Sequence, residues 1–307
     1  MTVIGVHPSQ WQQRHLTPLV EGLQTRGVTI VPATEADSVI VASRIDAEKA
    51  TWRRTPPKRL ILVEHGAGQQ YAHPTRGTID ASFGTPDPNV TLFLAPSQRV
   101  ADQMRHAVPR AVRVVVGSPA VERLRTARLD RMMAASVAGV AWPWTHVWTC
   151  HWQMHSPMNE SFTSWPWSLD VLKRMDPDVR VAHGHPRIQH RIVPNVPTGC
   201  RTETQWEVAA VDAAVLVADN TSVMWEALTV GIPVVAMTPP GWLDGAPHGF
   251  PRFGPDRVRL PTIHNPDDTA VRVAEAIEGG AFDPGVYEIV DGATDLAVSV
   301  IMNHVVD

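Results

Sequence analysis

The sequence has 307 residues, of which 44% are apolar and 19% charged, which suits two globular domains and excludes a disordered chain. Its net charge of −4 excludes a general basic field for nucleic acids. Two cysteines are too few for a disulfide framework, the N-terminus lacks a signal-peptide pattern, and no apolar run is long enough for a membrane span. We therefore expect a cytoplasmic protein.

Short β-branched runs alternate with helical patterns along the chain, as is typical of βαβ units and mainly parallel sheets. In the first half we expect strands at 2–6, 28–32, 38–42, 59–63, 91–95 and 113–116, and helices at 18–26 and 98–107. After a helical segment at 121–135, we expect strands at 137–141, 146–150, 179–182, 191–193, 214–218 and 233–237. Helices are expected at 167–175, 206–211, 222–229, 269–279 and 296–306. The pattern predicts two Rossmann-like domains, 1–130 and 131–307, facing each other across a cleft.

The segment at 214–237 is a strand, a polar turn, a helix, a glycine stop and a second strand. Four good N-cap residues form the turn, namely Asp219, Asn220, Thr221 and Ser222. The amides at the start of the helix, its dipole and the hydroxyls favour a phosphate-binding site. Glu226 lies one turn after Ser222, where its carboxylate can accept hydrogen bonds from ribose hydroxyls. The alternative is an ordinary capped helix with Glu226 as a surface charge.

Four histidines follow predicted strands. His65 lies in a Gly-rich turn after the strand at 59–63, where an imidazole can remove a proton from an acceptor hydroxyl. His183 and His185 follow the strand at 179–182 and share one face, but no matching carboxylate or cysteine set accompanies them, so we expect no metal. His151 lies at a strand exit that borders the predicted cleft. The alternative for His65 is a turn or capping role.

Residues near His65 are candidates for acceptor or sugar contacts. Glycines at this turn let the backbone approach a phosphate or a sugar closely. The candidates are Glu64, Gly66, Gly68, Gln69, Tyr71 and, from the second half, His151.

The 214–237 segment resembles the C-terminal motif D-x-S-S-x-x-x-E of CDP-glycerol glycerophosphotransferases and teichoic-acid polymerases. It is also similar to the corresponding segment of non-hydrolysing UDP-N-acetylglucosamine 2-epimerases. The resemblance implies that Asp219, Thr221 and Ser222 bind the donor diphosphate and that Glu226 binds the ribose. Thr221 stands where the family more often has serine. Asn220 lies within the same stretch and is counted with the donor site.

Two further segments carry the resemblance. His65 and Gly66 match the W-H-G-T-P motif of the glycerophosphotransferases, whose histidine is the general base. Glu64 replaces the aromatic residue and Ala67-Gly68 replaces Thr-Pro, which points to a donor group or acceptor other than glycerol phosphate. His185 and Pro186 resemble the H-P motif of both families, which implies that His185 neutralises donor phosphate charge or supports the leaving group. Arg187 would add a bidentate phosphate contact.

The resemblance implies a GT-B-like fold and a metal-independent glycosyltransferase with a nucleotide-diphosphate sugar, foremost a UDP-sugar, as donor and no further cofactor. A CDP-glycerol-type glycerophosphotransferase, an epimerase and a non-catalytic nucleotide-binding protein are the alternatives. Short transferases with an H-G-A-G-Q-like turn are similar to bacteriophage enzymes, for which the acceptor is a hydroxymethylated DNA base or a virion protein. A phage-encoded enzyme would act in the bacterial cytoplasm.

Two basic clusters are relevant to whether the acceptor is DNA. They are Arg53, Arg54, Lys58 and Arg59, and Arg123, Arg125, Arg128 and Arg131. With a DNA acceptor they would line one rim of the cleft; the alternative is a solvated helix or loop face. The tryptophans between 142 and 167 are either packing residues or a stacking surface for a sugar or base. The sequence leaves the oligomeric state open.

Overall fold

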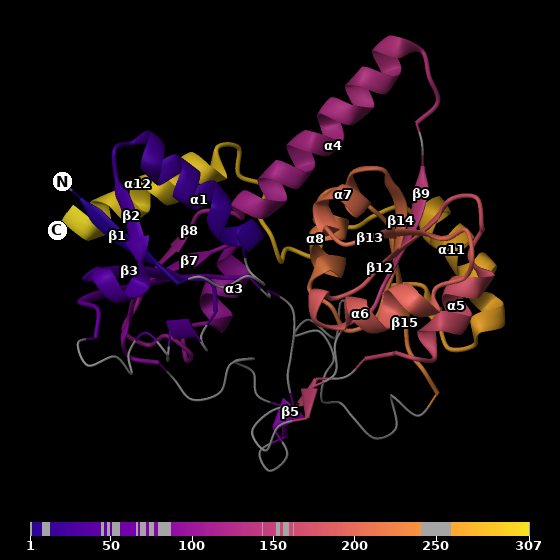
Figure 1. Ribbon diagram of the computed structural model, residues 1–307, viewed down its shortest axis with the longest axis horizontal. Helices are drawn as coiled ribbons and strands as arrows, with labels where there is room; N and C mark the ends of the chain where they lie inside the picture. The colour runs from indigo at the N-terminus through magenta and orange to yellow at the C-terminus, as the bar shows by residue number, and fades with distance from the viewer. Residues whose placement is uncertain are drawn as a thin grey trace. The chain divides into compact units, whose positions relative to one another are not determined.

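The computed structural model describes residues 2–7, 13–43, 46–47, 50, 56–65, 67, 72–73, 77–78, 87–142, 144–151, 154–155, 160–161, 163–240 and 259–306 (Figure 1). Contacts between residues divide the chain into two compact units. The first unit comprises Met1–Ala67, Phe83–Arg123 and Gly285–Asp307, and the second comprises Gly68–Ser82 and Leu124–Pro284. The predicted boundary at residue 130 therefore falls seven residues from the division, and the C-terminal tail packs with the first unit instead of the second.

The first unit is built on a six-stranded parallel sheet in the order β2-β1-β3-β4-β7-β8. Its strands are β1 (Val3–Val6), β2 (Thr29–Pro32), β3 (Ser38–Val41), β4 (Arg59–Val63), β7 (Val90–Ala95) and β8 (Val112–Val115). Its helices are α1 (Gln13–Thr25), the 3-10 turn η1 (Ala33–Glu35), α3 (Gln98–Gln103) and α12 (Ala293–Val306). The apolar runs of β3, β4 and β7 are buried because helices cover both faces of a parallel sheet.

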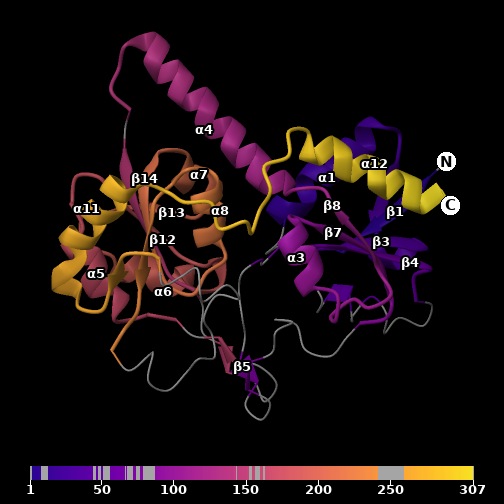
Figure 2. The same cartoon turned by 180° about the vertical axis from the view of Figure 1, so that it is seen from behind.

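The C-terminal helix α12 completes the core of the first unit. It runs beside α1 in both views, and its Ala297, Val298 and Ile301 join the apolar cluster around Ile4 and Leu19 (Figures 1 and 2). A chain segment that is last in the sequence thus covers the first strands. The predicted helix at 296–306 is confirmed, and the burial of its apolar face explains why it forms there.

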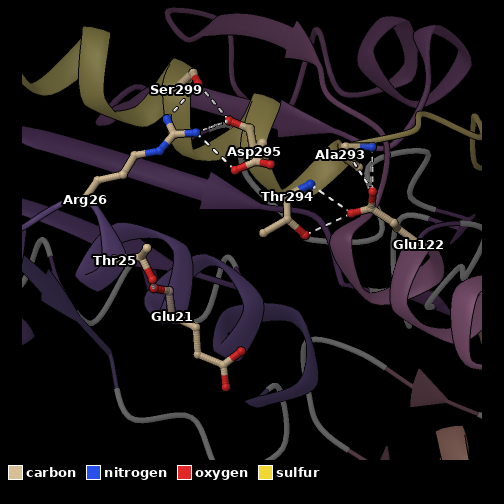
Figure 3. A network of polar contacts seen from close by, with 9 residues as sticks. Glu21, Thr25, Arg26, Glu122, Ala293, Thr294, Asp295 and Ser299 are labelled. Atoms are coloured by element: carbon tan, nitrogen blue, oxygen red, sulfur yellow. Dashed lines mark hydrogen bonds and ion pairs between the residues drawn. The ribbon is translucent and has the colours of Figure 1, made fainter.

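A single carboxylate fixes the start of α12. Glu122 lies in the first turn of α4 (Pro119–Ala138), and its two oxygens accept hydrogen bonds from the amides of Gly292, Ala293 and Thr294 at 2.6, 3.0 and 3.0 Å (Figure 3). The Thr294 hydroxyl adds a bond of 2.9 Å. These amides are the unpaired donors of a helix N-terminus, so Glu122 supplies the cap from outside the helix.

The second unit has its own six-stranded parallel sheet in the order β13-β12-β9-β14-β15-β16. Its strands are β9 (Thr145–Thr149), β12 (Arg180–His183), β13 (Arg201–Glu203), β14 (Ala213–Ala218), β15 (Val234–Met237) and β16 (Thr262–Ile263). Its helices are α5 (Ser168–Arg174), η2 (Pro186–Ile188), α6 (Gln189–Ile192), η3 (Val193–Asn195), α7 (Trp206–Val211), α8 (Val223–Thr229), η4 (Pro266–Asp268) and α11 (Thr269–Gly279). The two parallel sheets with their helices confirm the predicted two-domain α/β fold class.

A small antiparallel sheet joins two chain segments that are far apart in the sequence. Its order is β10 (Met154–His155), β11 (Glu160–Ser161), β5 (Ala72–His73) and β6 (Gly77–Thr78). Glu160 pairs with Ala72 across it. The segment that follows His65 in the sequence therefore pairs with the segment that follows His151, which no local pattern in the sequence indicated.

Two predicted strands are wrong. Residues 137–141 lie at the end of α4 and in the loop after it, with Val137 89% exposed, so they offer no buried face for a sheet. Residues 191–193 lie in α6 and η3, where Pro194 at the first turn of a short helix is compatible with helical dihedral angles. Among the helices that the structure describes, none has the length and apolar character needed to cross a bilayer.

Candidate functional site

In the second unit, the candidate residues gather at the carboxyl ends of three neighbouring strands. β12, β9 and β14 lie side by side in the parallel sheet, so their carboxyl ends share one edge. His151 follows β9, His185 follows β12, and Asp219 follows β14. The amide of His185 donates to the carbonyl of Cys150 at 3.1 Å, which ties the exits of β12 and β9 together. Parallel pairing thus brings residues from three separate motifs to one place.

Asp219 is completely buried and binds backbone and side-chain donors of the protein itself. One oxygen, Oδ1, accepts from the amide of His151 at 2.7 Å. The other, Oδ2, accepts from the amide and the hydroxyl of Ser164 at 2.8 and 2.9 Å, and from the hydroxyl of Thr163 at 3.4 Å. These bonds make Asp219 a positioning residue that holds the exit of β9 and the approach to α5 against the exit of β14.

The hydroxyls of Thr221 and Ser222 lie at the start of α8. Both residues are buried, and the Ser222 side chain makes no capping hydrogen bond to the helix. Neither hydroxyl is hydrogen-bonded within the described part of the chain. Asn220, beside them, is also buried. This end of the helix thus carries two hydroxyls that are not used for capping and that can donate hydrogen bonds.

Glu226 is buried on α8, where its Oε2 accepts a hydrogen bond from the indole Nε1 of Trp206 at 3.0 Å. The ring of Trp206 lies 5.9 Å from the ring of His183, whose Nδ1 is 3.0 Å from the hydroxyl of Thr149. Glu226 is therefore held in one orientation by α7, not left as a surface charge. Trp206 was missed in the sequence because a single tryptophan on a predicted helix gives no signal beyond packing.

His185 has a defined tautomer. Its Nδ1 accepts a hydrogen bond from the amide of Arg187 at 3.2 Å, so in the neutral ring the proton resides on Nε2. The ring meets that of His151 edge-to-face at 5.1 Å. His185 is half-buried, whereas Arg187 is exposed on the turn that follows. The Nε2–H of His185 is thus a donor suited to a phosphate oxygen.

In the first unit, His65 follows β4 and its ring is hydrogen-bonded to the backbone of Ala42. Burial lowers the pKa of His65 below its usual value, and Arg14 adds to this, while Glu64 and Asp46 oppose it. The ring is therefore neutral at pH 7, as a general base requires. Other candidates on this turn, namely Gly66, Gly68, Gln69 and Tyr71, lie outside the described residues.

A second histidine lies against His65. The ring of His15 on α1 is 6.1 Å from that of His65, at an interplanar angle of 79°. Burial lowers the pKa of His15 well below its usual value, and the positive charge of Arg14 acts in the same direction. His15 was not predicted as a site residue, because the predicted helix began at residue 18, whereas α1 begins at Gln13 and includes His15.

No family model and no curated protein matches the sequence. Solved structures do match over almost the whole chain. A variant of the wall teichoic acid polymerase TagF is 10% identical with a TM-score of 0.65, and the match covers 99% of this chain and 89% of that one. The Methanocaldococcus jannaschii UDP-GlcNAc 2-epimerase in complex with UDP-GlcNAc and UDP is 10% identical with a TM-score of 0.54, over 99% and 100% of the two chains. The S. aureus MnaA–UDP structure is 11% identical with a TM-score of 0.51, over 99% and 95%.

At these identities the likeness concerns the fold alone. This chain shares its two-domain, GT-B-like α/β fold with these proteins. The resemblance seen in the three sequence motifs therefore points to the same group as the whole-chain comparison, although the motifs cover well under half of the residues.

Proposed function

We propose that the chain is a metal-independent glycosyltransferase that moves a sugar from a nucleoside-diphosphate sugar, foremost a UDP-sugar, to an acceptor hydroxyl. The observation that carries the proposal is the pair of unused hydroxyls, Thr221 and Ser222, beside the oriented carboxylate of Glu226. Hydroxyls donate to phosphate oxygens, and a carboxylate accepts from the two ribose hydroxyls. Two of the fold relatives were solved with UDP, which supports a uridine nucleotide.

The reaction assigns one role to each group. The bond from the sugar carbon to the diphosphate oxygen breaks, and a new bond forms from that carbon to the acceptor oxygen. His65, neutral at pH 7, takes the proton of the acceptor hydroxyl. Thr221, Ser222 and the Nε2–H of His185 stabilise the charge that develops on the leaving diphosphate.

The acceptor is the open part of this proposal, and the structure does not strengthen the case for DNA. Three arginines of the second basic cluster are engaged within the protein: Arg123 pairs with Glu21, Arg128 donates to the carbonyls of Ala210 and Val211, and Arg131 pairs with Asp212. These contacts fit the alternative of a helix face, since all three arginines lie on α4 and bind groups of the protein itself. A hydroxymethylated DNA base thus stays a prediction from the sequence, together with the phage origin.

A thermal-shift panel of UDP, CDP, GDP, ADP and dTDP tests the proposal. We expect UDP to raise the melting temperature, and Ser222→Ala and Glu226→Ala to abolish the rise. Thr229→Ala is the matched control, because the Thr229 hydroxyl donates to the Trp225 carbonyl at the far end of the same helix. Stabilisation by CDP alone would favour a glycerophosphotransferase. The absence of stabilisation by every nucleotide would contradict nucleotide-dependent transfer.

Incubation with UDP-sugars separates the remaining candidates. A transferase releases UDP as it passes the sugar to an acceptor or to water, whereas a non-hydrolysing epimerase inverts the sugar carbon without net loss of UDP. We expect release of UDP that is lost in His65→Ala while UDP still binds. A non-catalytic nucleotide-binding protein would bind UDP and give neither product.

A further inference from the structure

A small cavity lies at the carboxyl ends of β4, β7 and β8 in the first unit. Its apolar wall is formed by Leu19, Val63, Leu94, Pro96, Val116 and Ala297. Its polar wall is formed by His15, Glu64 and Ser118. The carboxyl ends of parallel strands are where α/β folds bind ligands, and this cavity lies within a single unit.

His15 is the first indication of a ligand. Its side chain is 4% exposed and lines the cavity, yet it forms no hydrogen bond with the described part of the chain. A neutral imidazole has one donor and one acceptor nitrogen, and both can form hydrogen bonds with a ligand. A polar ligand in the cavity would form hydrogen bonds with both nitrogens of His15.

The start of α4 is the second indication. Ser118 precedes this helix of 20 residues, and its Oγ accepts from the amide of Val121 at 3.4 Å. Gly117, which also lines the cavity, has a φ of 74°, and a side chain there would meet Val290 at 2.9 Å. The turn into α4 therefore has no side chain at Gly117, where it forms part of the cavity wall.

The groups that line the cavity favour an uncharged ligand. An anion would meet the Glu64 carboxylate, which is 6% exposed and therefore poorly screened by water. A cation would have to lose its hydration in a cavity whose wall is mostly apolar. A hydroxyl group carries no charge, donates one hydrogen bond and accepts another. It can donate to Glu64 and accept from a ring N–H of His15.

We propose that this cavity is a subsite for one uncharged hydroxyl group of the acceptor, held between Glu64 and His15. The inference rests on the proposed function for its biological ligand, because the ring of the proposed base His65 is 6.1 Å from that of His15. The bound hydroxyl is not the reacting one. It donates to Glu64 and orients the acceptor, whereas His65 takes the proton of the hydroxyl that attacks the sugar.

Histidine-labelled protein tests the subsite directly, by NMR of the imidazole signals. The His15 and His65 signals are assigned with His15→Gln and His65→Gln variants. The probes are ethylene glycol, acetate and methylammonium, which are of similar size and carry a charge of zero, minus one and plus one. We expect a saturable shift of the His15 signal with ethylene glycol alone. A shift that grows linearly without saturation, or an equal response to either ion, would overturn the proposal.

Cavity filling provides the structural control. Ala297→Val adds two methyl groups at the cavity wall and is expected to abolish the shift. Ala101→Val makes the same change at a buried position of α3 in the same unit, away from the cavity, and is expected to retain it. Both variants are first checked for cooperative unfolding. If Ala297→Val folds and still shows the shift, the glycol binds elsewhere and the inference fails.

The result of the glycol titration can be distinguished from the result of the nucleotide-binding test of the proposed function. UDP binding to the second unit together with no glycol shift would refute the subsite and leave the transferase proposal intact. A saturable glycol shift together with no binding of any nucleotide would refute the transferase and leave a hydroxyl-binding cavity.

Discussion

The indole nitrogen of Trp206 donates a hydrogen bond to Oε2 of Glu226 over 3.0 Å, and both side chains are buried. This bond joins α7 to α8 and fixes the orientation of the carboxylate. A buried carboxylate without a donor is costly, so the pair is important for stability as well as for the ligand site. Under the proposed function, the same carboxylate accepts hydrogen bonds from the ribose hydroxyls.

Removal of this donor is the first test. Trp206→Phe keeps most of the ring and removes the N–H, so we expect a loss of about 1–3 kcal/mol in the free energy of unfolding. We also expect UDP affinity to fall about tenfold, because Glu226 loses its orientation. Urea denaturation and calorimetry measure the two effects. Trp144→Phe, at a residue that is 44% exposed, is the control and should change neither. Unchanged stability in Trp206→Phe would contradict the role of the bond.

Asp219 is expected to act through the loops that it holds. In Asp219→Asn the carboxylate becomes an amide with a single acceptor oxygen, so the amides of His151 and Ser164 can no longer both be satisfied. We expect a loss of about 2–4 kcal/mol in stability and weaker UDP binding. Asp212→Asn breaks an ion pair with Arg131 on the surface and is expected to cost less than about 1 kcal/mol. Equal effects of the two substitutions would contradict this account.

The two histidines of the first unit predict how stability depends on pH. The pKa of His15 and that of His65 are lowered in the folded protein, chiefly by burial. The unfolded chain takes up protons on both near pH 6.5, whereas the folded chain does so only at lower pH. The two histidines therefore do not reduce the free energy of unfolding above about pH 7. Below about pH 6.5 their protonation in the unfolded chain lowers it. Denaturation in urea at several pH values measures this slope, and His15→Gln should reduce it. A slope that is the same in this variant would exclude His15 as a source.

The cap on α12 predicts a local effect. Glu122→Ala removes the acceptor of the Gly292, Ala293 and Thr294 amides, so the first turn of α12 should open more often. Substitution of a cap typically costs about 0.5–2 kcal/mol. Hydrogen exchange should become faster at residues 292–296 while the sheet of the first unit stays protected. Glu21→Ala, which breaks only the exposed pair with Arg123, should leave the exchange unchanged.

The sequence predicted the fold class because its strands are short β-branched runs with clear stops. The apolar run at β14 is buried in the centre of a parallel sheet. Such a run can be recognised as a strand from the local sequence alone. The two wrong strands have different causes. In residues 191–193 the apolar Ile192 is buried, but it lies in a helical turn instead of a strand. Residues 137–141 are apolar yet exposed, and only the tertiary structure shows that no strand lies beside them.

The sequence indicated which residues could form the candidate site, but not which residues contact them. Spacing along the chain indicated the hydroxyls of Thr221 and Ser222, because a polar turn before a helix has a local signature. Ser164 and His151, which bind Asp219, lie 55 and 68 residues away along the chain, and Trp206, which binds Glu226, lies 20 residues away. The contact between His15 and His65 likewise depends on how α1 packs against the end of β4, which the sequence pattern does not encode locally.

Calorimetric titration with UDP tests the central claim most directly, in the natural chain and in a variant that carries Thr221→Val and Ser222→Ala together. If the two hydroxyls donate to the diphosphate, UDP binds the natural chain at one site per molecule, and the double variant loses at least about a hundredfold in affinity, since hydrogen bonds to charged groups contribute about 1.5–3 kcal/mol each. Thr229→Ala should bind UDP as the natural chain does. Equal affinity in the natural chain and the double variant would contradict the assignment of the donor site to the start of α8.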